Sequence, residues 1–214
     1  MSLAERWPLE GGGDLRDELL AAWGSGERGY HDLRHLAEVL DRLADLGCSD
    51  SRVLLAAWFH DAVYDGLPEA EERSARWAED ALPSLGLSAE EVAEVARLVR
   101  LTEGHRPAPG DVAGGALTDA DLAILAADDA RYAEYVAGVR AEYAHVPEPD
   151  FAAGRAAVLS DLLAKETLFH TAVARERWEE RARENLAREL ADLADRRTPF
   201  SPPIRTTWGA PDGR

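Results

Sequence analysis

Apolar residues recur at helical spacing in nearly every segment of this chain, and almost no segment alternates strictly between apolar and polar residues. A period near 3.6 predicts helices that each bury one face, whereas strict alternation would predict strands. Ala, Leu, Glu and Arg, which all favour helices, dominate the sequence. We therefore expect an all-α fold.

Glycines, prolines and N-cap residues divide this pattern into segments. We expect helices over residues 13–23, 31–46, 51–64, 69–82, 88–102, 119–127, 129–145, 150–170 and 172–195. Residues 103–116 carry two prolines and four glycines, which predicts a loop. A loop of this length inside a compact domain is usually functional, so we interpret it as a lid or a wall of a site.

The 214 residues with 46% hydrophobic content predict one domain, a compact helical bundle over residues 1–196. Residues 197–214 have little periodicity, and we expect an irregular C-terminal tail there. The composition is compatible with either a monomer or a homo-oligomer. The longest apolar run, Val53 to Phe59, is far shorter than the roughly 20 residues that span a bilayer.

The charge balance limits which classes of partner the protein can bind. With 24 Lys and Arg against 41 Asp and Glu, the net charge is −17, which repels nucleic acid polymers and anionic membranes. A small phosphorylated molecule stays compatible, because a metal ion can reverse the field inside one pocket. The single Cys48 excludes an intramolecular disulfide and the first residues lack secretion-signal features, so we expect a cytoplasmic location.

The strongest chemical signal is the pair His60-Asp61 at the end of the apolar run. Such a run predicts a buried helix, and a buried charge needs a partner. A divalent metal would supply it, because His nitrogen and Asp oxygen both ligate zinc, manganese, iron or nickel. The alternative is a helix end that emerges into solvent with Asp61 exposed.

His31 and His35 are four residues apart, so on one helix they share a face and can point at one site. A single histidine is more often structural than a ligand. The coincidence of two such histidines with His60-Asp61 favours a shared site.

The segments YHDLRHLAEVL, AAWFHDAVYD, EERSA, TDADLAIL and FAAGRAAVL resemble the HD superfamily, and within it the bacterial predicted metal-dependent HD phosphohydrolases. The resemblance covers roughly residues 20–190. It implies an HD-type helical domain and four ligands to a divalent ion, which by motif position are His35, His60, Asp61 and Asp121. The ion would be Mn, Zn, Ni, Co, Fe or Mg, and a second ion is left open.

Asp119 competes with Asp121 for the fourth ligand position. The second aspartate of an Asp-Ala-Asp string is the usual ligand in related domains, which favours Asp121. Thr118 and Asp121 also fit a capping box, in which case Asp121 would only begin a helix.

The resemblance also suggests catalytic and binding roles. Asp61 would act in catalysis as well as ligation, and Glu72, in preference to Glu71, would work on the attacking water. His31 and His105 lie close to the motif but have no standard role in it. His31 could support the ligands from behind or bind the substrate phosphate, and His105 could ligate a second ion or contact the leaving group. Arginines can pair with phosphate through their forked donors, and the candidates are Arg28, Arg34, Arg73 and Arg155.

The resemblance implies a phosphohydrolase in which metal-bound hydroxide attacks the phosphorus of a small substrate, which could be a nucleotide. Three alternatives stay open. The chain could be an HD-type iron oxygenase, a non-catalytic metal-containing module that binds a nucleotide or a partner, or a helical scaffold without metal.

Overall fold

Helices form every regular element that the computed structural model describes, which comprises residues 2–26 and 28–197. The all-α prediction is confirmed. In chain order the elements are η1 (Ala4–Arg6), α1 (Gly13–Trp23), α2 (Leu33–Asp45), α3 (Ser51–Phe59), α4 (Ala70–Ala81), η2 (Leu82–Leu85), α5 (Ala89–Leu101), α6 (Val112–Leu122), η3 (Ala123–Ala126), α7 (Asp129–Glu142), α8 (Glu148–Ala164) and α9 (Ala172–Arg197).

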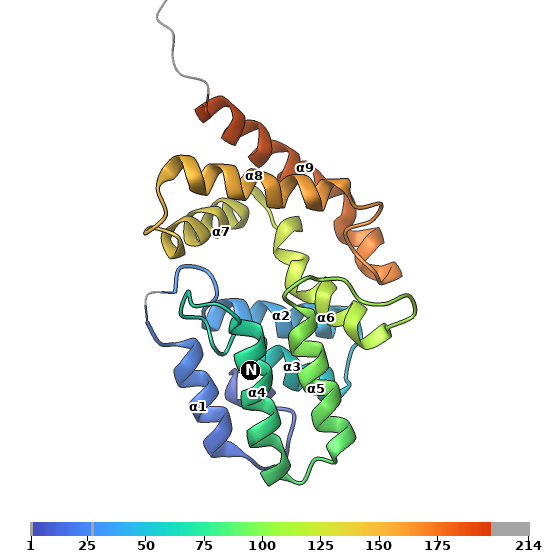
Figure 1. Cartoon of the computed structure of the whole chain (residues 1–214). Helices are drawn as coiled ribbons and strands as arrows, with labels where there is room; N and C mark the ends of the chain where they lie inside the picture. The colour runs from blue at the N-terminus through green and yellow to red at the C-terminus, as the bar shows by residue number, and fades with distance from the viewer. Residues whose placement is uncertain (1, 27, 198–214) are drawn as a thin grey trace, which may run out of the picture.

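The helices bury two hydrophobic clusters. The first cluster lies among α1 to α6, and the second lies mainly among η3, α7, α8 and α9. Figure 1 shows the same division, with α7 to α9 on one side of the molecule and α1 to α6 on the other. Helix α3 supplies the centre of the first cluster, because its apolar run leaves Leu55, Trp58 and Phe59 without exposed surface. The separate cores leave a boundary between the two groups of helices.

The loop between α1 and α2 touches α7 across this boundary at unusually close range. A Cβ atom built on Gly29 would lie 2.2 Å from the carbonyl oxygen of Gly138, and one built on Gly138 would lie 2.5 Å from that of Gly29. One turn further along α7, the Glu142 carboxylate accepts hydrogen bonds from the backbone N–H groups of Tyr30 at 2.8 Å and His31 at 2.9 Å. Only glycine at both contact positions allows this approach.

Several expected boundaries differ from the structure. Helix α8 ends at Ala164 and not at 170, because the backbone at Lys165 is extended, and the helix expected over 119–127 is divided between α6 and η3. Helix α3 ends at Phe59 and not at 64, because Arg28 binds the carbonyls of Asp61 and Ala62 at 2.8 and 3.0 Å, outside a helical ladder. Helix α6 begins at Val112, within the expected loop 103–116. Asp111 caps the start of this helix. Gly114 lets the side chain of Leu101 pack against the helix backbone, since a Cβ at this position would lie 2.6 Å from that side chain.

Helix α9 extends to Arg197, and the rest of the expected tail lies outside the described residues. Within the helices that the structure describes, none has the length and hydropathy needed to cross a membrane.

Candidate metal centre

Asp32 fixes the first turn of α2 and with it the position of His35. Its Oδ1 accepts hydrogen bonds from the backbone N–H groups of Arg34 at 2.8 Å and His35 at 3.1 Å. A short acidic residue satisfies N–H groups that the start of a helix leaves unpaired. The His35 ring is buried against Tyr30, with ring centroids 4.6 Å apart.

His60 and Asp61 directly follow α3, and their position is held from two sides. The indole N–H of Trp23 donates to the carbonyl of Trp58 at 2.8 Å. The guanidinium of Arg28 donates to the carbonyl of Asp61 at 2.8 Å. Both side chains are buried, so the alternative in which Asp61 emerges into solvent does not describe this structure.

The two aspartates of α6 contact different parts of the molecule. Asp119 is fully buried, and its carboxylate accepts hydrogen bonds from the backbone N–H groups of His170 and Thr171, both at 2.7 Å, just before α9. Asp121 instead faces His35 and His60. Because Asp121 lies near the C-terminal end of α6, it does not begin a helix in a capping box with Thr118.

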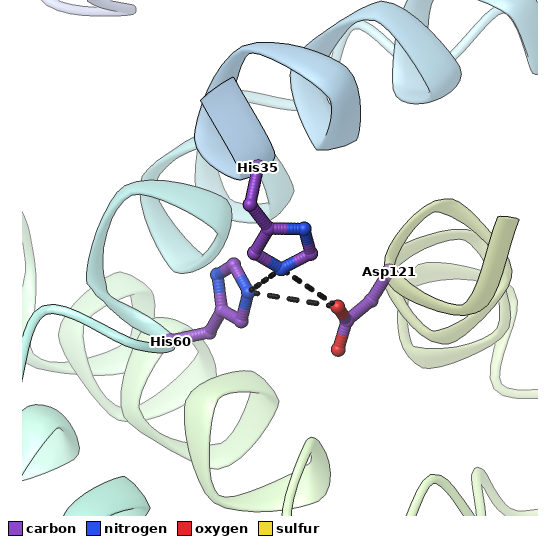
Figure 2. A group of neighbouring side chains, drawn as sticks. All are labelled: His35, His60 and Asp121. Atoms are coloured by element: carbon purple, nitrogen blue, oxygen red, sulfur yellow. Dashed lines mark hydrogen bonds and ion pairs between the residues drawn. The ribbon is translucent and has the colours of Figure 1, made fainter. Parts of the chain in front are cut away.

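His35, His60 and Asp121 converge on one point (Figure 2). Nε2 of His35 lies 3.2 Å from Nε2 of His60 and 3.2 Å from Oδ1 of Asp121. Nε2 of His60 lies 3.7 Å from the same oxygen and 3.2 Å from Oδ2 of Asp61. The structure thus brings together all four residues that the sequence singled out as ligands.

The electrostatics of this cluster favour a cation. Burial opposes the charged form of His60, but Asp61 and Asp121 outweigh burial and raise the pKa of His60 well above its usual value. Burial would raise the pKa of Asp61, but the nearby His60 outweighs it and lowers that pKa. The two carboxylates thus favour positive charge at this buried place, and a divalent ion bound by them and by the neutral imidazoles would supply it in place of the proton on His60.

The donor atoms also fit a metal ion. The ligand atoms of His35, His60 and Asp121 all lie within 4.8 Å of one another. Ligand atoms about 2 Å from a shared ion lie roughly 3 to 3.5 Å apart, close to the distances in this cluster. The ring Nδ1–H of His60 donates to the carbonyl of Ala57 at 2.8 Å, so its Nε2 can present a lone pair to the cluster. The group can therefore hold a metal ion.

A cavity of about 650 Å³ adjoins the cluster, and Asp61 and Asp121 form part of its lining. We call the side of the cavity next to the cluster its floor. Besides Asp61 and Asp121, the polar side chains of the floor are His31, Tyr64, Glu71, Thr102, Glu103 and His105. The opposite wall comes from η3, α7, α8 and the segment between α7 and α8. The volume lies within the range of pockets that hold small molecules.

His31 and His105 both line this cavity, where the sequence predicted substrate contacts. Nδ1 of His31 is 2.8 Å from Oε2 of Glu142, and the His31 ring stacks on Tyr64 with centroids 4.2 Å apart. Nε2 of His105 is 2.7 Å from Oδ2 of Asp121. His105 has the left-handed φ of 49°, which a non-glycine residue rarely adopts. The loop holds this ring against the carboxylate from the side opposite His35.

The acidic residue preferred for water activation lies elsewhere. Glu72 accepts hydrogen bonds from Arg76 at 2.8 Å and from Arg100 at 3.1 Å. These contacts, and the one with Arg100 most of all, lower the pKa of Glu72 to about 2. Glu71, the alternative, lines the cavity. Adjacent residues on a helix point about 100° apart, so α4 can direct only one of them at the site.

The arginines are mostly engaged away from the cavity. Arg28 braces backbone carbonyls, as described above, and its other hydrogen bond goes to the carbonyl of His31 at 2.7 Å. Arg34 pairs with Glu38 and Glu134 on the surface, and Arg73 pairs with Asp65. Arg155 does line the cavity. The structure thus gives Arg28 a positioning role where we expected a substrate contact.

Glu142 is the site residue that the sequence did not reveal. Burial would raise its pKa, but its hydrogen bonds and proximity to His31 outweigh burial and lower the pKa to about 2. It lies at the end of α7, 111 positions from His31. Nothing in the local pattern around it indicates this contact.

No protein-family model, curated protein or solved structure matches this chain.

Proposed function

We propose that this protein is a metal-dependent phosphohydrolase that acts on a small phosphorylated substrate. One observation carries the proposal: a buried His/Asp cluster suited to a divalent ion shares Asp61 and Asp121 with the floor of a cavity of about 650 Å³. A structural metal site is closed by its protein ligands, whereas a catalytic one keeps positions open for water and substrate. The adjoining cavity supports the second kind of site.

His35, His60, Asp61 and Asp121 would hold the ion. When bound, a divalent ion lowers the pKa of a water molecule and polarises a phosphoryl oxygen. His/Asp ligation without thiolate favours a catalytic ion over a structural zinc.

The surrounding side chains would orient the substrate and handle protons. His31 is held by Glu142 through Nδ1, so its Nε2 edge is the one that can meet a phosphoryl oxygen. Glu71 and Glu103 line the same side of the cavity as the cluster and are carboxylates that could accept a proton from an attacking water. Arg28 and His105 would position the ligands, through the carbonyl of Asp61 and the carboxylate of Asp121.

Elemental analysis of gently purified protein, followed by a phosphate-release screen, tests the proposal. The screen covers nucleotides and non-nucleotide phosphate esters with Mn, Co, Ni and Zn, on wild type, His60→Ala and the control His145→Ala. His145 is exposed and lies outside the cluster. We expect His60→Ala to lose metal and turnover while the control keeps both.

Wild-type protein without metal, or turnover unaffected by His60→Ala, would overturn the proposal. Iron content with oxygen-dependent turnover would instead support the oxygenase. Bound metal with no turnover on any ester would support the non-catalytic module.

A further inference from the structure

The cavity has two chemically different sides. The floor beside the metal cluster is polar, whereas the wall of η3, α7 and α8 is largely apolar. Along α8 the wall residues recur at helical spacing at Phe151, Val158 and Leu162, and α7 contributes Tyr135 and Val139. This spacing places one face of each helix against the cavity, and on α8 that face also carries Asp150, Gly154 and Arg155.

Part of this apolar wall is exposed to solvent. Large apolar side chains are exposed at only a few places in the described part of the chain, and two of them, Tyr143 at 44% and Val158 at 51%, line this cavity. Exposed apolar surface that adjoins a polar site is typical of a ligand-binding surface. The wall is therefore built to contact an apolar group.

The charges of the lining limit how many phosphates can bind. Arg155 is the one arginine among the described lining residues, and Glu189 holds it at 2.7 and 3.0 Å. The carboxylates of the lining are Asp61, Glu71, Glu103, Asp121 and Asp150. Away from the metal cluster the cavity thus has little positive charge to pair with a second or third phosphate.

From these observations we infer that the substrate carries a single phosphoryl group joined to a bulky, uncharged, apolar group, which packs against α7 and α8. The inference rests on the proposed function for the phosphoryl end. It excludes nucleoside di- and triphosphates as preferred substrates. The apolar end would gain about fourfold in affinity for each buried CH₂ group.

A series of n-alkyl phosphates from methyl to hexyl tests this directly, because the charged end stays constant while the apolar end grows. On the Mn²⁺-loaded protein we expect kcat/KM to rise about fourfold for each added CH₂ until the wall is covered. We expect ATP and inorganic pyrophosphate to be poorer substrates than hexyl phosphate.

The matching n-alkylphosphonates provide a second measurement that needs no turnover. Calorimetry of the Mn²⁺-loaded protein should show Kd falling with chain length. Val158→Asn should reduce the hexyl-to-methyl ratio of affinities at least about threefold. The control is Val112→Asn, which makes the same change at an exposed helical valine outside the cavity.

The two measurements separate the inference from the proposed function. Chain-length-dependent phosphonate binding without any phosphate release would support the apolar wall and overturn the hydrolase proposal. Phosphate release with no dependence on chain length would support the hydrolase proposal and overturn the inference about the apolar wall. Equal Kd values along the phosphonate series, or equal effects of Val158→Asn and Val112→Asn, would overturn the inference whether or not phosphate is released.

Discussion

The imidazole of His105 meets the carboxylate of Asp121 at 2.7 Å, on the oxygen that does not face His35. One oxygen of Asp121 is thus free to bind an ion while the other is held in place. Outer partners of this kind orient a ligand and adjust its basicity.

We expect His105→Phe, which keeps a ring but removes the hydrogen bond, to weaken metal binding about 10- to 100-fold. Titration of metal-free protein with Mn²⁺ or Zn²⁺ measures this effect. His145→Phe is the control and should bind metal as the wild type does. An unchanged Kd in His105→Phe would show that the contact does not position the ligand.

The two aspartates of α6 should respond oppositely to substitution. Asp119→Ala leaves two partly buried N–H groups without their acceptor, and we expect a loss of about 1–3 kcal/mol in the free energy of unfolding, measured in urea. Asp121→Asn should keep most of that stability and lose metal affinity. If Asp119→Ala instead abolished metal binding in a folded protein, the assignment of these residues would be reversed.

The close contact between Gly29 and Gly138 predicts a steric penalty. Gly138→Ala would place a Cβ 2.5 Å from the carbonyl oxygen of Gly29, so we expect a loss of about 1–3 kcal/mol of stability. Gly154→Ala in α8 is the matched control, because a Cβ there meets nothing within 4 Å. It should stabilise the protein by up to about 1 kcal/mol, since alanine favours helices. Similar urea midpoints for the two variants would contradict this prediction.

Glu142 should make stability depend on acid pH. Its pKa is about 2 in the folded protein against 4.5 in the unfolded chain, so the unfolded chain takes up the proton first as pH falls. The contribution is complete above pH 4.5 and is lost as pH falls towards 2. We expect Glu142→Gln to cost about 1–3 kcal/mol at neutral pH, and this difference from wild type should shrink below pH 4.5.

Glu134→Gln is the control for this experiment, because Glu134 lies on the same helix and its side chain is exposed in its ion pairs with Arg34 and Arg131. Exposed pairs contribute little, so this variant should unfold like the wild type. A stability difference for Glu142→Gln that stays constant down to pH 3 would show that the carboxylate is not the group responsible.

Local signals in the sequence predicted the helical class and grouped His35 with His60 and Asp61, and the family resemblance favoured Asp121 as the fourth ligand. The apolar run required α3 to be buried, and that burial carried His60 and Asp61 inside. No local signal distinguished Asp119 from Asp121, and the structure places the favoured Asp121 in the cluster. Residues two apart on a helix point about 200° apart, so the answer depends on which face of α6 meets α2 and α3.

Other features depend on contacts between segments distant in the chain. Glycine is read as a helix breaker in sequence, yet Gly114 lies inside α6 because Leu101 packs against its backbone. The choice of Glu72 over Glu71 failed to place a carboxylate at the cavity, because Arg100 on α5 holds Glu72. No local pattern contains that information.

The cavity has its polar floor on one group of helices and its apolar wall on the other, and each group has its own hydrophobic cluster. A molecule that binds both sides acts as a non-covalent crosslink between two separately packed units. Its binding free energy then adds to the free energy required to separate α7 and α8 from the metal cluster. Amide hydrogens of these two helices would report occupancy of the site, through slower exchange, even when no bond in the ligand is broken.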